Sequence, residues 1–98
     1  MRPRRITQPR NVVGRAVQKR RAELGWSQAT LAAKCQLAGW DVSRGIVAAI
    51  EGRVRWVGDF EVALLAKVLG TFVADLYPQR CDWGELGLPG VGPAPRRR

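Results

Sequence analysis

The chain has no histidine and only two cysteines among its 98 residues. A structural zinc site takes four Cys or His ligands, so a zinc finger is excluded. Histidine is also the commonest general acid or base, and the eight acidic residues are scattered without forming a pair, so we expect no enzyme activity, no metal and no cofactor. Cys35 lies on the apolar side of a predicted helix, far from Cys81, which favours a buried free thiol over a disulfide.

Long apolar runs are missing as well. No stretch approaches the roughly 18 consecutive apolar residues that a membrane span needs. The basic start, residues 1–5, leads into no hydrophobic segment of the kind found in signal peptides. We therefore expect a soluble cytoplasmic protein that has no membrane partner.

Acidic residues are scarce, since 8 Asp and Glu oppose 17 Lys and Arg and the formal net charge is +9. Such a charge favours an anionic partner, either a nucleic acid or an acidic membrane surface. The positive charge is concentrated in residues 1–22, which contain eight basic residues and no acidic one, and in the arginines at 96–98. Because the central part is slightly acidic, attraction for phosphate must come from the two ends, the first helix and a few well-placed arginines.

The spacing of apolar residues predicts helices and shows no alternating strand pattern. We expect an all-α domain at residues 11–78, preceded by a basic flexible arm at 1–10 and followed by a Gly/Pro-rich tail at 79–98. Five short helices are predicted, at about residues 11–24, 27–39, 43–52, 59–69 and 71–77. Apolar residues at helical spacing are predicted to face the core, namely Val13, Val17, Leu24, Leu31, Ala32, Cys35, Val47, Ile50, Phe60, Leu64, Leu65, Val68, Phe72 and Leu76.

Small polar residues mark three of the predicted helix starts, Asn11, Ser27 and Ser43. A side-chain oxygen at such a position accepts a hydrogen bond from a free amide of the first turn. The acidic residue that completes a capping box is replaced by Thr30, so the box after Ser27 is incomplete. Gly52 is predicted to end the third helix in the left-handed conformation.

Two of the capped segments form the most informative pattern in the chain. The first begins with Ser27-Gln28, with Leu-Ala three residues further on, and the second ends with Ile50-Glu51 before a glycine. In this order and at these spacings, the chain resembles the Cro and phage-repressor (XRE) family over about residues 11–78. The resemblance implies a compact five-helix, lambda-repressor-like helix-turn-helix domain. The matching residues are Arg21, Gly25, Ser27, Gln28, Leu31, Ala32, Val47, Ile50, Glu51, Leu64, Leu65, Ala66, Leu69 and Leu76.

The resemblance also implies roles for individual residues. Gln28 touches a phosphate and braces the recognition helix, while Arg21 and Glu51 form a structural ion pair. The recognition helix, about residues 43–51, enters the major groove of double-stranded DNA. The residues implied at base edges are Ser43, Arg44, Gly45, Ala48 and Ala49. The residues implied at phosphates are Gln28, Arg53 and Arg55. Outside the resemblance, we expect Arg4 and Arg5 in the basic arm to extend the phosphate contacts along the duplex or into an adjacent minor groove.

The chain departs from the family pattern in two ways. From Leu31 to Ser43 it is about five residues longer than the usual spacing, which predicts a longer second helix or a wider loop with Trp40 packed over the turn. The recognition helix offers only Arg44 as a strong bidentate base contact, and its small apolar side chains suit thymine methyl groups or readout of DNA shape. Trp56, in the loop after that helix, is expected to pack rather than to lie against a sugar.

These features predict a sequence-specific DNA-binding transcriptional regulator of prokaryotic or phage type, acting in the nucleoid as a homodimer. Trp83 and Leu86 in the tail are candidates for the dimer contact. Two alternatives stay open. One is a protein-interaction module, such as an antitoxin-like binder of a protein partner, that retains the helix-turn-helix fold. The other is nonspecific packaging of nucleic acid by the basic ends.

Overall fold

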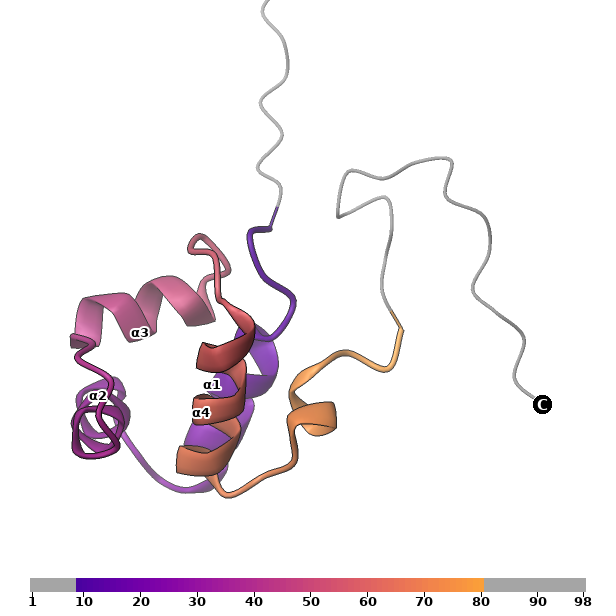
Figure 1. Ribbon diagram of the computed structural model, residues 1–98. Helices are drawn as coiled ribbons and strands as arrows, with labels where there is room; N and C mark the ends of the chain where they lie inside the picture. Colours follow the sequence, from indigo (N-terminus) through magenta and orange to yellow (C-terminus); the bar gives the residue numbers. More distant parts are fainter. Residues whose placement is uncertain (1–8, 81–98) are drawn as a thin grey trace, which may run out of the picture.

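Helices make up the regular structure of residues 9–80, the part of the chain that the computed structural model describes, and no strand occurs there. The elements are α1 (Gly14–Glu23), α2 (Gln28–Leu37), α3 (Arg44–Glu51), α4 (Asp59–Leu69) and the 3-10 helix η1 (Val73–Leu76) (Figure 1). The all-helical prediction is confirmed for this part of the chain. None of these helices is long and apolar enough to cross a membrane.

The predicted fifth α-helix, at residues 71–77, is not confirmed. Phe72 and Tyr77 on either side of η1 are both extended, with ψ angles of 149° and 146°. Only four residues are left between them, and so short a segment closes as a tighter 3-10 turn instead of an α-helix. Pro78 then follows, which has no amide hydrogen to continue the helix.

Serine side chains begin α2 and α3, as predicted. Ser27 Oγ accepts a hydrogen bond from the Thr30 amide at 3.0 Å. Ser43 Oγ accepts one from the Ile46 amide at 3.1 Å. Each bond satisfies one of the amides that the first helical turn leaves without a partner. Local sequence therefore fixes where both helices of the motif begin.

The predicted cap position at Asn11 is wrong by two residues, because α1 begins at Gly14 and its N-cap residue is Val13. Asn11 contributes to the helix start from outside the cap position. Asn11 Oδ1 accepts hydrogen bonds from the amides of Val13 at 3.1 Å and Gly14 at 2.8 Å. One side-chain oxygen thus satisfies two amides at the start of α1.

The residue that ends α3 in the left-handed conformation is Arg53, so the prediction for Gly52 is wrong by one position. Gly52 has a φ of −79° and Arg53 a φ of 61°. The Gly52 amide still donates a helical hydrogen bond to the Ala48 carbonyl at 2.9 Å, so the helix continues through Gly52. A non-glycine residue in this conformation costs about 1 kcal/mol, which contacts elsewhere must offset. Gly25 and Gly70, after α1 and α4, do adopt positive φ.

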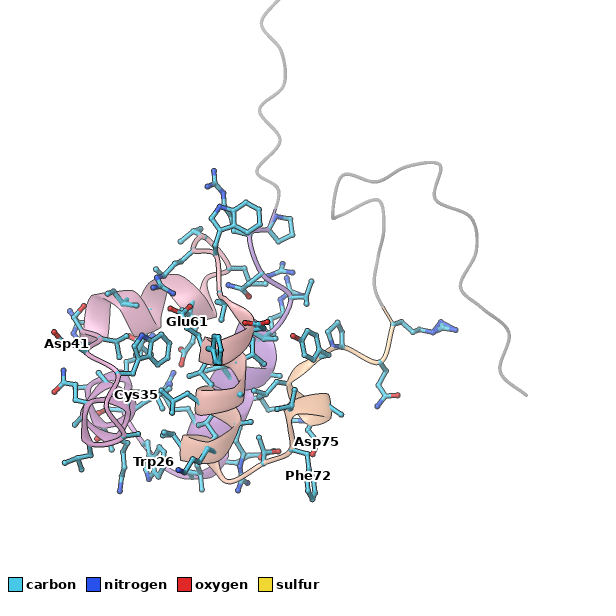
Figure 2. All side chains as sticks on the ribbon, in the orientation of Figure 1. Trp26, Cys35, Asp41, Glu61, Phe72 and Asp75 are labelled. Atoms are coloured by element: carbon cyan, nitrogen blue, oxygen red, sulfur yellow. The ribbon has the colours of Figure 1, made fainter. Side chains whose placement is uncertain are left out.

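The core lies between the four α-helices, and η1 packs against α1 and α4 through Leu76. The buried hydrophobic residues are Val13, Val17, Leu31, Ala32, Cys35, Val42, Val47, Ile50, Val62, Leu65, Ala66, Leu69 and Leu76. The core predictions for Phe60 and Phe72 are wrong, since their exposed fractions are 88% and 79%. Phe60 lies about 200° around α4 from the buried Val62. Phe72 sits in the extended segment before η1 and projects away from the helical body (Figure 2).

The connection between α2 and α3 is a wide loop, residues 38–43, rather than an extension of α2. Gly39 reverses the chain with a φ of 99°, and Val42 is buried. Gln36 Nε2 donates a hydrogen bond to the Val42 carbonyl at 2.6 Å, which holds the loop against the end of α2. Trp40 packs half-buried against the core, in agreement with its predicted role. The extra residues therefore leave α2 and α3 packed against each other.

Cys35 lies in the interior as an unpaired thiol, as predicted (Figure 2). Burial raises the pKa of this thiol from its ordinary value of 9.0, so the neutral form dominates at physiological pH. Cys81 lies outside the described residues.

Candidate nucleic-acid interface

One side of α3 is buried in the core and the other is open to solvent. Val47, Ile50 and Glu51 face inward and are buried. A Cβ added at Gly45 would have only the Ser43 hydroxyl oxygen nearby, at 3.7 Å, so the outer face has room for a close approach. The residues predicted to meet base edges are all exposed or half-exposed, namely Ser43, Arg44, Gly45, Ala48 and Ala49.

The C-terminal end of α3 is held by the Glu51 carboxylate, which contacts two other helices. Glu51 Oε2 lies 2.6 Å from Arg21 Nε on α1, and Oε1 lies 3.0 Å from Arg21 Nη2. Gln28 Nε2 on α2 donates to the same Oε1 at 3.0 Å. The exposed fractions of the Glu51 and Arg21 side chains are 3% and 14%, so water screens the pair little. One buried carboxylate therefore joins α1, α2 and α3.

Arg21 also makes a contact outside this pair. Its Nη1 donates to the Trp26 carbonyl at 2.8 Å, in the connection between α1 and α2. The hydrogen bond with Glu51 raises the pKa of Arg21, so the guanidinium stays charged. Because this charge neutralises Glu51, the carboxylate adds no net repulsion toward a phosphate near α3.

Gln28, predicted both to touch a phosphate and to brace the recognition helix, is half-buried at the first residue of α2. Its amide nitrogen is directed to Glu51, so it makes a bracing contact within the protein. The phosphate contact stays a prediction. Amide groups at a helix start favour a nearby anion in any case.

Arg55, predicted as a phosphate contact, is engaged inside the domain. Its Nη1 and Nη2 lie 3.1 and 3.4 Å from the two carboxylate oxygens of Glu61 on α4. The guanidinium carbon lies 6.0 Å from the centre of the Trp40 ring in the wide loop. Arg55 therefore links the α2–α3 loop to α4. Local patterns could not predict this bridge, because the two partners lie 15 and 6 residues away in the sequence.

Glu61 is held as a carboxylate by these contacts. Partial burial acts to raise its pKa, but hydrogen bonds from Arg55 and from the Gly58 amide outweigh burial, and the pKa falls below its ordinary value of 4.5. The Gly58 amide donates to Glu61 Oε1 at 3.0 Å. This is half of a capping box, since glycine has no side chain to return the bond.

Trp56, predicted to pack, has an exposed fraction of 69%. The neighbouring Val57 takes the packed position against the core instead. The guanidinium carbon of Arg10 lies 5.5 Å from the centre of the Trp56 ring. Arg53, predicted at a phosphate, is half-buried in the same loop, and its carbonyl accepts a hydrogen bond from the Arg10 amide at 2.9 Å.

Asn11 holds this loop in place, a role that sequence reasoning missed. Its Nδ2 donates to the carbonyls of Ile50 at 3.1 Å and Arg55 at 2.9 Å, while its Oδ1 accepts from the Gly14 amide at the start of α1. The sequence pattern indicated that Asn11 lies at a helix start. Nothing in the sequence indicated that the Asn11 side-chain amide would reach a loop some forty positions away. The N-terminal end of the domain is thereby fixed to the end of α3.

Several predicted positions fall outside residues 9–80. These are Arg4 and Arg5 in the arm, and Trp83 and Leu86 in the tail. Their assigned contacts stay predictions. Within the described stretch, no group of three or more His, Cys, Asp or Glu side chains is placed to hold a metal ion.

The fold has a counterpart among solved structures. The chain is similar to a crystal structure of the hypothetical transcription factor NHTF from Neisseria, with a TM-score of 0.61 and 23% sequence identity. The match covers 80% of this chain and 84% of the other. Comparisons with protein-family profiles and with curated proteins find no match. At this level of identity, the likeness shows that the two chains share an all-helical fold.

Proposed function

We propose that this protein is a sequence-specific, DNA-binding transcriptional regulator of the Cro and phage-repressor (XRE) type, acting in the nucleoid. The observation that carries the proposal is the arrangement of α3. Its inner face is buried and its last residue, Glu51, is clamped to α1 and α2. Its outer face is left accessible and includes Arg44. A rigidly mounted helix with an open outer face is what insertion into a major groove requires.

Base recognition is assigned to the start and outer face of α3. Arg44 is the strongest base-reading group there, because a guanidinium donates two hydrogen bonds to the O6 and N7 acceptors of guanine. Gly45, Ala48 and Ala49 allow the helix backbone to approach closely and place small apolar surfaces against thymine methyl groups. Ser43 uses its oxygen to cap α3 but still has a hydroxyl proton to donate.

Phosphate contacts are assigned to the positive groups that surround α3. These include Arg53 in the following loop and the start of α2 with Gln28. Arg4 and Arg5, which lie outside the described residues, are assigned to phosphates on their charge alone. The formal net charge of +9 supports the assignment, because phosphate contacts supply most of the affinity for a duplex. Arg55 is a weaker candidate than the sequence indicated, since Glu61 already binds both ends of its guanidinium.

A homodimer completes the proposal, because two recognition helices must reach successive major grooves about 34 Å apart. Exposed apolar side chains around η1 support a contact there, since Phe72, Val73 and Tyr77 have exposed fractions of 79%, 44% and 44%. In Figure 1, η1 lies on the far side of α1 and α4 from α3. A contact at this surface would leave α3 free for DNA.

A protein-interaction module is the second candidate function. It is favoured by the scarcity of polar groups on the outer face of α3, where Gly45, Ala48 and Ala49 offer no side-chain donor or acceptor. Such a face would accept an apolar partner surface as readily as a thymine methyl group. The two functions differ in how their binding responds to salt.

Selection of bound sequences from random duplexes, followed by salt titration on the recovered site, tests the proposal. We expect a palindromic site and an affinity that falls steeply with salt. Arg44→Ala should flatten the preference between sites, whereas Arg53→Ala should weaken all sites alike. Lys67→Ala, at the end of α4, is the matched loss of one exposed charge and should change neither. Random duplexes that yield no preferred sequence, together with variants that all bind like wild type, would favour the protein-interaction module.

A further inference from the structure

Trp56 is a large aromatic side chain held at the surface beside positive charge. Its exposed fraction of 69% is unusual, because tryptophan side chains are on average highly buried in folded proteins. Arg55 directly precedes Trp56 in the sequence, and Arg53 lies three positions before it. The guanidinium carbon of Arg10 lies over the Trp56 ring, 5.5 Å from its centre. The ring therefore carries a cation on one face, within the range of a cation–π interaction.

The main chain at Arg10 is held against the loop by its own amide and by the side chain of the next residue. The Arg10 amide donates to the Arg53 carbonyl at 2.9 Å. The next residue, Asn11, donates to the carbonyls of Ile50 and Arg55. Three hydrogen bonds thus tie the N-terminal end of the domain to the end of α3 and its loop. The Arg10 and Trp56 pair is therefore built into the fold.

The pair lies near the C-terminal end of α3. In Figure 1, the loop after α3 and the segment leading into α1 lie together beyond the C-terminal end of α3. The exposed aromatic side chain at Phe72 projects from the opposite end of the molecule (Figure 2). A partner that extends along α3 past its C-terminal end therefore meets the Arg10 and Trp56 pair, whereas Phe72 lies at the opposite end of the molecule.

We propose that Arg10 and Trp56 form a second DNA contact, which seats the sugar-phosphate backbone beside the groove that α3 enters. The inference rests on the DNA-binding function proposed above. Arg10 supplies the charge-assisted hydrogen bonds to a phosphate, and the indole provides an apolar surface for a deoxyribose and an N–H donor for a phosphate oxygen. Stacking pre-orients the guanidinium, so less side-chain freedom is lost on binding. The contact adds affinity without reading sequence.

Single substitutions separate the two members of the pair. Trp56→Ala should weaken binding to a selected duplex about five- to tenfold and leave the slope of log affinity against log salt unchanged, because no charge is lost. Trp56→Phe keeps an aromatic face and should lose less. Arg10→Gln should weaken binding and reduce the magnitude of that slope by about 0.9, the value of one phosphate contact. Phe60→Ala, which removes an exposed aromatic side chain from α4, is the matched control and should bind as wild type.

A second measurement distinguishes contact with DNA from a purely structural role of the stack. Duplex binding should protect part of the tryptophan fluorescence from quenching by acrylamide, and Trp56→Phe should abolish most of this protection. Melting by circular dichroism shows whether each variant is folded, and a highly exposed residue should change stability little. If the wild-type protein binds the duplex and both Trp56→Ala and Arg10→Gln bind it equally well, the inference is overturned and the proposed function stands. Failure of the wild-type protein to bind any duplex would instead overturn the proposed function.

Discussion

Removal of the Glu51 carboxylate is the most informative perturbation of this domain. In the native state the side chain accepts hydrogen bonds from Arg21 Nε at 2.6 Å, Arg21 Nη2 at 3.0 Å and Gln28 Nε2 at 3.0 Å. Glu51→Ala leaves a guanidinium that is 14% exposed without its charge partner. Loss of one member of a well-desolvated pair costs about 3–5 kcal/mol in the free energy of unfolding.

The magnitude sets a clear experimental expectation. For a domain of this size, each kcal/mol corresponds to about 4–8 °C in melting temperature, so Glu51→Ala should melt at least about 12 °C below wild type. Urea unfolding followed by circular dichroism measures the same loss as a free energy. Glu51→Gln, which keeps the size and one acceptor oxygen, should lose less, and it remains measurable if Glu51→Ala does not fold.

Glu23→Ala provides the matched control. It also removes one glutamate from an arginine pair, but the Arg20 and Glu23 side chains are 34% and 49% exposed and 3.5 Å apart. Such a surface pair contributes at most about 1 kcal/mol. A Glu51→Ala loss no larger than that of Glu23→Ala would refute the argument from burial. An unchanged melting temperature combined with lost DNA binding would refute our view that Glu51 acts on stability first.

Three further predictions follow from particular contacts. Gly14→Ala should destabilise the domain by about 1–3 kcal/mol, measured by urea unfolding, because its Cβ would overlap the Ile50 carbonyl oxygen. The Arg55 and Glu61 pair should stabilise the fold above about pH 4.5 and lose that contribution as pH falls through the lowered pKa of Glu61. The stability difference between wild type and Glu61→Gln should therefore shrink in acid, and a difference independent of pH would contradict this. Replacement of thymine by deoxyuridine in a selected site should weaken binding if the small face of α3 meets thymine methyl groups, whereas equal affinity would exclude such contacts.

Helix starts were the most predictable part of this structure. Ser27 and Ser43 each cap the helix that the sequence placed after them, and Asn11 accepts hydrogen bonds from the amides at the start of α1. A cap depends on one side chain and on amides two or three residues away, so the necessary information lies within a few positions. The inward positions of α3 were equally predictable, because Val47 and Ile50 fall on one face of any helix that begins at Ser43.

The buried face of α4 and the form of the segment after α4 were less predictable. Helical spacing placed Phe60 and Phe72 in the core, yet both are exposed. Which face of α4 turns inward depends on the helices packed against it, and the buried stripe begins at Val62. The segment after α4 is apolar, but only four residues lie between the extended Phe72 and Tyr77, too few for an α-helix. These four residues form a 3-10 turn that buries Leu76 in the core.

The sequence by itself determined the helical class, the capped starts of α2 and α3, and the concentration of positive charge in the first 22 residues, because these depend on neighbouring residues or on composition. Tertiary structure alone decided the roles of the loop after α3. Asn11 reaches across to Ile50, Arg55 turns to Glu61, and Trp56 stays at the surface under Arg10. These contacts join positions 6 to 46 residues apart, and the distances between such positions are fixed only when the helices have packed.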